Sequence, residues 1–245
     1  MKKSILILSV LAVSIVMTSC LGDVDPGYTD DTIVYIDMDT NGTIYGKTIP
    51  NNQYIYSRFI TSPEIQMLYP GEFKRMAYSW QEEDGTTPID INFRADNVTL
   101  SGEIEDIDKT SLYLSSSPEV EEPEKFITEI RPIIGGSYLD DYWLFDNFIY
   151  EATKDQTAAV YFYWNEEKSD IGTGIAHIDI HLEVNGEPQG SVSSKTGVIA
   201  LDMSPLRGIY GGGTKDEIVV QFTYYRKDRN GPVESPLYRM DVAVN

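Results

Sequence analysis

The sequence predicts an all-β protein in which a small barrel is followed by a β-sandwich. Two observations carry this prediction. Short runs of β-branched and aromatic residues recur along the chain with turn residues between them, and no long amphipathic helical period interrupts them. An acidic segment with two prolines, residues 115–125, separates these runs into two groups. We therefore expect two β-domains rather than one doubly wound α/β sheet.

The first group of runs begins with a hairpin. Asn41-Gly42 is a strong short-range signal for a tight β-turn, and β-branched or aromatic residues lie on both sides of it. Similar runs downstream predict the remaining strands of the barrel. The strands expected in this half are residues 32–37, 43–49, 53–60, 73–80, 89–93 and 98–107.

The second group continues in the same style. The strands expected here are residues 142–150, 157–164, 176–184, 197–203, 217–225 and 237–244. Within 176–184, apolar residues alternate strictly with His177, Asp179, His181 and Glu183, which is the period of a half-buried strand. The two histidines then face solvent roughly 13 Å apart, too far to share a zinc ion.

The acidic segment sets the expected domain boundaries. Its charge and its prolines are typical of a linker, and its low apolar content predicts that the two halves have independent cores. We expect a signal peptide over residues 1–19, a tether over 20–31, a barrel domain over 32–114, a linker over 115–125 and a sandwich domain over 126–245.

The N-terminal residues have the order of a bacterial lipoprotein signal. Lys2 and Lys3 precede an apolar run from Ile5 to Met17, and small polar residues then lead to Cys20. The run is shorter than the roughly 20 residues that a membrane-spanning helix needs. We expect cleavage before Cys20 and lipidation of this residue, so that acyl chains hold the protein on a membrane.

Composition excludes several classes of function. The chain has 39 acidic and 19 basic residues and a formal net charge of −20, which argues against a nucleic-acid partner because phosphate binding depends on lysine and arginine. Cys20 is the only cysteine. Once it is lipidated, disulfides, cysteine-ligated zinc and thiol catalysis are excluded. We expect no cofactor.

A weak calcium candidate lies in the first hairpin. Asp37, Asp39 and Asn41 reproduce the opening of a calcium-binding loop, D-x-D-x-N-G. The position of the closing bidentate glutamate is taken by Thr48. We therefore interpret the segment as a plain β-turn, with calcium binding as the weaker alternative.

Two enzyme-like motifs are incomplete. Residues 208–215 approach a phosphate-binding loop, but Thr214 and Lys215 stand in the reverse order and a strand follows, so we expect an inter-strand loop. The chain has no G-x-S-x-G nucleophile elbow, and pairs of carboxylates are uninformative in a sequence with so many acids. We expect that the protein is not an enzyme.

Aromatic residues are the more informative candidates for binding. The sequence has 17 tyrosines and three tryptophans, aromatic faces stack on sugar rings, and negative charge does not repel neutral glycans. Filling of a β-core is the alternative role of such residues. The candidate glycan or protein contacts are Tyr161, Tyr163, Tyr224 and Tyr225, to which Trp80 and Trp143 can be added.

Several segments together resemble one known family. They are the lipobox at Cys20, the acids that follow it, residues 68–75 leading into a strand, and the strands that contain 142–145 and 216–222. In this layout the chain resembles the NigD-like lipoproteins of Bacteroidetes. The resemblance implies an OB-like barrel followed by an Ig-like β-sandwich, anchored to the outer membrane by its lipid on either the surface-exposed or the periplasmic face.

The resemblance also implies a function. It suggests a non-catalytic interaction protein with a bacteriocin-related or immunity role, and it supplies no catalytic residues. The alternative is a glycan-binding surface lipoprotein of a polysaccharide-utilisation system. In both cases the partners are the membrane and a protein or glycan ligand.

Overall fold

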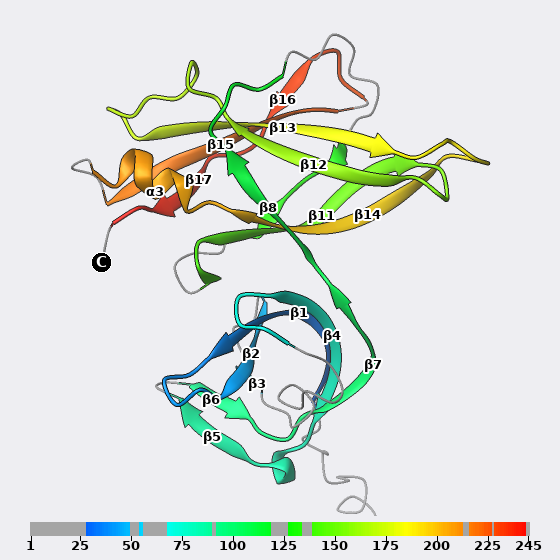
Figure 1. Ribbon diagram of the computed structural model, residues 1–245, viewed down its shortest axis with the longest axis vertical. Coiled ribbons are helices and arrows are strands. Elements are labelled where there is room, and N and C mark those ends of the chain that lie inside the picture. Colours follow the sequence, from blue (N-terminus) through cyan, green and yellow to red (C-terminus); the bar gives the residue numbers. More distant parts are fainter. Residues whose placement is uncertain are drawn as a thin grey trace, which may run out of the picture.

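The computed structural model describes residues 28–49, 54–55, 68–89, 92–118, 127–133, 139–212, 216–226 and 228–243. These residues form two sheets of seven and ten strands, with a single α-helix. The first sheet curls into a partly closed barrel below the second (Figure 1). The prediction of an all-β barrel and sandwich is confirmed. The expected signal peptide, Cys20 and the tether up to residue 27 lie outside the described residues.

The first sheet has the order β5-β6-β3-β2-β1-β4-β7. Alternation along its strands places Val34, Ile36, Met76 and Tyr78 in the barrel core, where each is almost fully buried. The strands are β1 (Tyr28–Met38), β2 (Ile44–Ile49), β3 (Tyr54–Ile55), β4 (Phe73–Trp80), β5 (Thr86–Ile89), β6 (Asn92–Ala95) and β7 (Thr99–Asp106).

The expected hairpin joins β1 to β2. The Asp39 amide donates to the Thr43 carbonyl at 2.9 Å, and Gly42 has a φ of 82°, which glycine adopts without strain. The prediction of one strand over 89–93 is wrong, because Ile89 is the last residue of β5 and Asn92 is the first residue of β6, which pairs antiparallel with β5. In the expected strand 53–60, only Tyr54–Ile55 falls within the described residues.

The second sheet has the order β10-β11-β14-β8-β12-β13-β15-β16, with β9 paired to β11 and β17 paired to β15. It folds over so that β11 and β14 face β12, β13 and β15 (Figure 1). The strands are β8 (Asp108–Tyr113), β9 (Ile127–Glu129), β10 (Pro132–Ile133), β11 (Tyr142–Ala152), β12 (Thr157–Trp164), β13 (Ile175–Asn185), β14 (Ser193–Asp202), β15 (Glu217–Tyr225), β16 (Pro232–Glu234) and β17 (Tyr238–Asp241).

Aromatic side chains fill the space between the two layers of this sandwich. The Phe145 ring lies 5.0 Å from Phe162 and 5.3 Å from Phe222, and Trp143 is fully buried beside them. Offset and edge-to-face aromatic pairs of this kind add to the free energy of burial. They make this the larger of the two cores.

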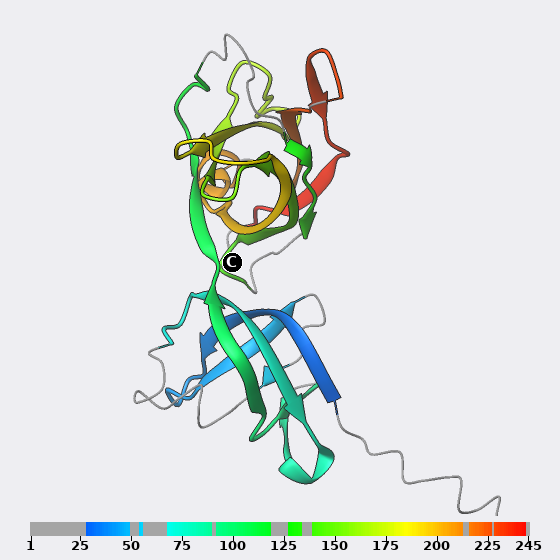
Figure 2. The ribbon, with the colours of Figure 1, turned by 90° about the vertical axis from the view of Figure 1, so that its right-hand side faces the viewer.

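The chain passes from the first sheet to the second earlier than the sequence suggested. Strand β8 lies within the expected barrel domain, 32–114, but it pairs in parallel with both β14 and β12 of the second sheet. The crossing therefore falls at Ile107, between β7 and β8 (Figure 2). Polar side chains dominate β8, and backbone pairing on both edges is what holds it in the sheet. Residues 119–125 of the expected linker lie outside the described residues.

A small apolar cluster joins the two sheets. We call it the intersheet cluster; its buried members are Ile33, Tyr35, Ile49 and Phe73 from the first sheet and Leu139, Leu144 and Ala200 from the second. Strand β1 contributes residues to both the barrel core and the intersheet cluster. Its alternate residues face opposite sides of the sheet, and both sides are covered. The cluster argues against the expectation that each half has an independent core.

Residues 208–215 also differ from the expectation of a plain inter-strand loop. Part of this expected inter-strand loop belongs to the helix α3 (Pro205–Tyr210), which begins with proline in the first turn and buries Leu206 and Tyr210. Residues 213–215 lie outside the described residues. Within the part of the chain that the structure describes, no helix is long and apolar enough to cross a membrane.

Candidate functional site

A pocket of about 360 Å³ opens on the outer face of the second sheet. It lies over β13 and β15 and is closed on two sides by the segment after β8 and by β16. We call it the β13–β15 pocket. Its lining residues are Ser117, Pro118, Lys168, Asp179, Ile180, His181, Thr223, Tyr225 and Pro232.

Sheet register brings the pocket's polar side chains together. Strands β13 and β15 run in parallel, and Asp179 is the direct partner of Thr223. The inward residues Ile178, Ile180 and Phe222 pack in the sandwich core, so alternation turns Asp179 and Thr223 to the outer face. Two segments that are distant in sequence thereby place a carboxylate beside a hydroxyl.

Two oxygen atoms of the pocket are buried without a hydrogen bond from any described residue. Thr223 is only 7% exposed, and its Oγ1 has no partner among the described residues. Asp179 Oδ1 is also buried without a hydrogen bond, although Lys168 Nζ lies 3.6 Å away. A buried polar atom without a partner costs free energy, so both atoms mark a place for a polar ligand or a water molecule.

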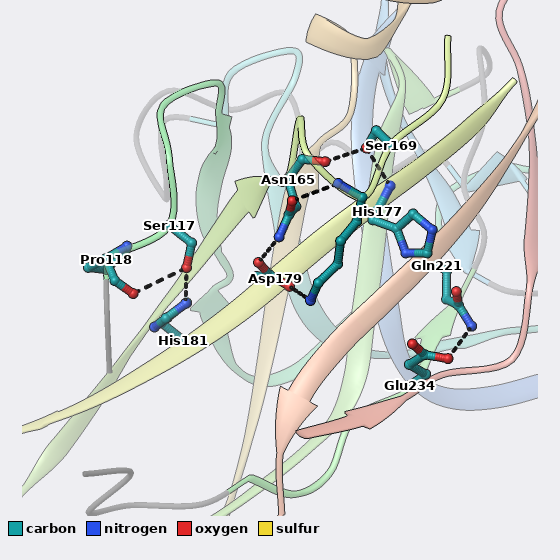
Figure 3. Close-up of polar contacts among 10 residues, drawn as sticks. Ser117, Pro118, Asn165, Ser169, His177, Asp179, His181, Gln221 and Glu234 are labelled. Atoms are coloured by element: carbon teal, nitrogen blue, oxygen red, sulfur yellow. Dashed lines mark hydrogen bonds and ion pairs between the residues drawn. The ribbon is translucent and has the colours of Figure 1, made fainter. Parts of the chain in front are cut away.

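The loop after β12 holds the other side of the Asp179 carboxylate (Figure 3). The Asn165 side-chain amide donates to Asp179 Oδ2 at 2.6 Å, while Asn165 Oδ1 accepts from the Lys168 amide at 3.0 Å. Ser169 links this loop to β13, because its Oγ donates to the Asn165 carbonyl and accepts from the His177 amide at 2.9 Å. The carboxylate is therefore fixed in orientation before any ligand binds.

His181 forms the opposite wall of the pocket. Its Nε2 is hydrogen bonded to Ser117 Oγ, and its ring makes an edge contact with Tyr163 at 5.3 Å between centroids. Desolvation lowers the pKa of His181, against the opposing effect of Asp179 and Glu183. This shift favours the neutral imidazole, which serves as a hydrogen-bonding group without charge.

The expected strand position of both histidines is confirmed. They alternate with the apolar residues of β13 and are half-buried rather than fully exposed. His177 Nδ1 is buried and has no partner among the described residues. The Ser117–His181 contact was not expected, because Ser117 lies in the segment taken as a linker.

A tyrosine rim adjoins the pocket on the β12 side. Tyr113 of β8 stacks on Tyr163 at 5.2 Å and lies 6.2 Å from Tyr161. Tyr113 is 42% exposed, so the rim offers aromatic surface to solvent. On the other side, Tyr225 lines the pocket itself, two residues after Thr223 on the same face of β15.

Tyr224 is the one candidate tyrosine that points elsewhere. It is 8% exposed and belongs to the sandwich core, since neighbouring residues of a strand face opposite sides. Trp80 and Trp143 are likewise core residues. Sequence reasoning missed Tyr113, Asn165, Lys168 and Thr223, and for Asp179 the alternation of β13 was the only signal.

The carboxylates of the calcium candidate have partners within the hairpin. Asp37 is ion-paired with Lys47 and accepts from the Tyr45 hydroxyl at 3.0 Å. Burial would raise the pKa of Asp37, but these hydrogen bonds lower it below its usual value. Asp39 Oδ1 accepts from the amides of Asn41 and Thr43, both at 2.8 Å. Among the described residues, no group of three or more His, Cys, Asp or Glu could hold a metal ion.

Comparison with known proteins supports the fold alone. No protein-family model and no curated protein matches the chain. The chain is similar to an uncharacterized protein from Parabacteroides merdae, with a TM-score of 0.59, 9% identity, and coverage of 89% of this chain and 100% of the other. It is also similar to a protein from Parabacteroides distasonis described as toxin related, with a TM-score of 0.53, 8% identity, and coverage of 88% and 94%.

A further solved structure is a NigD-like immunity protein from Bacteroides caccae. Its TM-score is 0.48 at 12% identity, with coverage of 85% of this chain and 91% of the other. At such identities the first two likenesses show a shared two-part β-architecture. They carry no function over to this chain.

Proposed function

We propose that this protein is a non-catalytic lipoprotein of the cell envelope that binds a ligand on the outer face of its second sheet. The observation that carries the proposal is the β13–β15 pocket, whose lining includes two buried oxygen atoms without a hydrogen bond from any described residue. A concave, partly polar pocket of this size is where small ligands bind in proteins. The lipid on Cys20 would hold this surface at the outer membrane.

The contacts of the pocket favour binding over catalysis. Ser117 and His181 have the residue types of a nucleophile and a base, but a working pair needs a third group that orients the base. Asp179, which lies two residues from His181 on the same face, is held by Asn165 and faces Lys168. We therefore assign the Ser117–His181 pair to closing the wall of the pocket. Hydrolysis of model esters that disappears in Ser117→Ala would contradict this assignment.

A protein partner is the second candidate. The exposed stack of Tyr113 on Tyr163 favours it, because tyrosines supply rigid contact area in protein interfaces. A bacteriocin is the partner that the NigD-like resemblance implies. Such a partner would cover the tyrosine rim rather than enter the pocket.

The proposed lipid anchor is tested on the N-terminus of the mature protein. Mass spectrometry should find an acylated Cys20 as the first residue, and Cys20→Ala should release the protein from the membrane fraction. An unmodified thiol would refute the proposed anchor. Protease treatment of intact cells then separates the surface-exposed face from the periplasmic face.

The binding face is tested by hydrogen exchange on the full mature chain. It is incubated with an envelope extract of the source bacterium, either untreated or boiled to remove folded protein. We expect slower exchange in β13 and β15, and the effect should weaken in Tyr225→Ala. Protection confined to the first sheet, or none with either extract, would contradict the proposed function.

A further inference from the structure

Resting on the proposed function, we propose that the β13–β15 pocket binds a neutral sugar, with neighbouring ring hydroxyls hydrogen bonded to Asp179 and Thr223. Thr223 is the first of the two pocket residues that indicate such a ligand. Its hydroxyl is more than nine-tenths buried, lines the pocket and has no partner among the described residues. A group in this position is stabilised only when something that enters the pocket bonds to it.

Asp179 Oδ1, next to Thr223, indicates which groups the ligand must carry. Asp179 Oδ1 is a carboxylate oxygen that only accepts, so its partner must donate. Thr223 Oγ1 can donate or accept, and the parallel register places it beside Asp179. Two adjacent hydroxyl groups on one ligand satisfy both atoms, because a hydroxyl both donates and accepts.

Charge excludes the charged alternatives. Lys168 Nζ, at 3.6 Å from Asp179 Oδ1, balances this carboxylate and repels a cationic ligand. Glu183 on the same face of β13 and Glu234 on β16 repel an anion. The whole chain, with a net charge of −20, adds to that repulsion. Neither repulsion acts on a neutral ligand that carries several hydroxyl groups.

Size and aromatic surface agree with a sugar ring. The pocket holds about 360 Å³, at the small end of ligand sites. Tyr225 lines the pocket, and a tyrosine ring is a surface on which the C–H groups of a sugar can pack. The stack of Tyr113 on Tyr163 continues the aromatic surface beyond His181, where a second sugar of a longer chain would lie.

The test is calorimetry on the full mature chain with a defined panel. The panel contains neutral mono- and oligosaccharides of the gluco, manno, galacto, xylo and fuco configurations, with uronic acid and amino-sugar polymers as charged comparators. We expect at least one neutral sugar to bind and the charged polymers to bind more weakly. Thr223→Val and Asp179→Asn should each weaken binding about tenfold.

Matched variants separate the site from general effects. Thr157→Val makes the same change on an exposed position of β12, and Glu183→Gln removes a charge from the same face of β13 outside the pocket. Both should keep the affinity of the wild type. Thr223→Val should also melt no earlier than the wild type, since it removes a hydroxyl for which the described residues supply no hydrogen bond. A lower melting temperature would show that the hydroxyl has a partner in the free protein and would overturn the premise.

The remaining outcomes distinguish this inference from the proposed function. Failure of the whole neutral panel, stronger binding of a charged polymer, or unchanged affinity in both pocket variants would overturn the sugar assignment. If β13 and β15 are protected by the untreated extract but not by the boiled one, the proposed function stands with a protein ligand. If neither extract protects them, both proposals are wrong.

Discussion

Phe73→Ala should uncouple the unfolding of the two sheets, because the Phe73 side chain belongs to the apolar cluster that joins them. Phe73 is 1% exposed in the intersheet cluster, with its ring 4.9 Å from Tyr35 and 5.3 Å from Tyr142 across the junction. Truncation of a buried phenylalanine to alanine costs about 3–5 kcal/mol in lost transfer free energy and cavity formation. In a chain of this size that lowers the melting temperature by roughly 10 °C.

The order in which the two sheets unfold is a sharper test than the total loss of stability. Tyr35 lies in the same cluster and is hydrogen bonded through its hydroxyl to Asp140 of the second domain. We therefore expect the wild-type sheets to unfold together. In Phe73→Ala, the first sheet should exchange its amides at lower denaturant than the second, because its own core is the smaller one.

Hydrogen exchange with mass spectrometry in increasing urea measures this directly, with β4 reporting the first sheet and β13 the second. Phe162→Ala is the matched control, since Phe162 is 0% exposed within the sandwich core alone. It should destabilise the second sheet first. If wild-type β4 and β13 already open at different urea concentrations, and Phe73→Ala moves only β4, the intersheet cluster does not couple the sheets and the reasoning is refuted.

Three further predictions concern single residues. Desolvation lowers the pKa of His181 in the folded chain, so the folded state binds fewer protons than the unfolded state and stability should fall as pH drops below about 6.5, the usual histidine value. Urea titrations at pH 7.5 and 5.5 should show a smaller loss of stability in His181→Gln than in the wild type. An equal loss in both proteins would contradict the prediction. Gly46→Ala places a Cβ 2.5 Å from Val34 Cγ1 in the barrel core and should cost about 1–3 kcal/mol, whereas Gly208→Ala in α3 meets no atom within 4 Å and should not destabilise the chain in thermal melts. Asp141→Asn keeps a residue type that tolerates the φ of 65° at this position. It breaks the ion pair with Arg207, whose Nη2 donates to Asp141 Oδ1 at 2.7 Å. Chemical denaturation should show a loss of about 1–3 kcal/mol in the free energy of unfolding, and an unchanged value would mean that the pair contributes nothing.

The strands that sequence analysis located best are those with a local signal. The expected runs 73–80, 157–164 and 217–225 coincide with β4, β12 and β15, because β-branched and aromatic residues with period-two alternation need no information from elsewhere in the chain. The hairpin at Asn41-Gly42 is local in the same sense, since the turn residues themselves favour it.

Strand β8 shows where local signals end. Its sequence, Asp108–Tyr113, is mostly polar, and only Leu112 is buried. What makes it a strand is parallel pairing with β12 and β14, which follow it in the chain by many residues. Parallel partners of this kind come together only when the whole sheet forms, so the sequence placed β8 in the wrong domain.

The sequence by itself determined the fold class and the alternation of the strands that carry a local signal, because both follow from residue types at neighbouring positions. Alternation along a strand requires that Tyr224 and Tyr225 face opposite sides of β15, although the sequence analysis proposed both as contacts. Only the tertiary structure decided which of them faces the core, since that depends on the layer packed against β15. The pocket has the same origin: Asp179 and Thr223 become neighbours through the register of two distant strands, which no local pattern encodes.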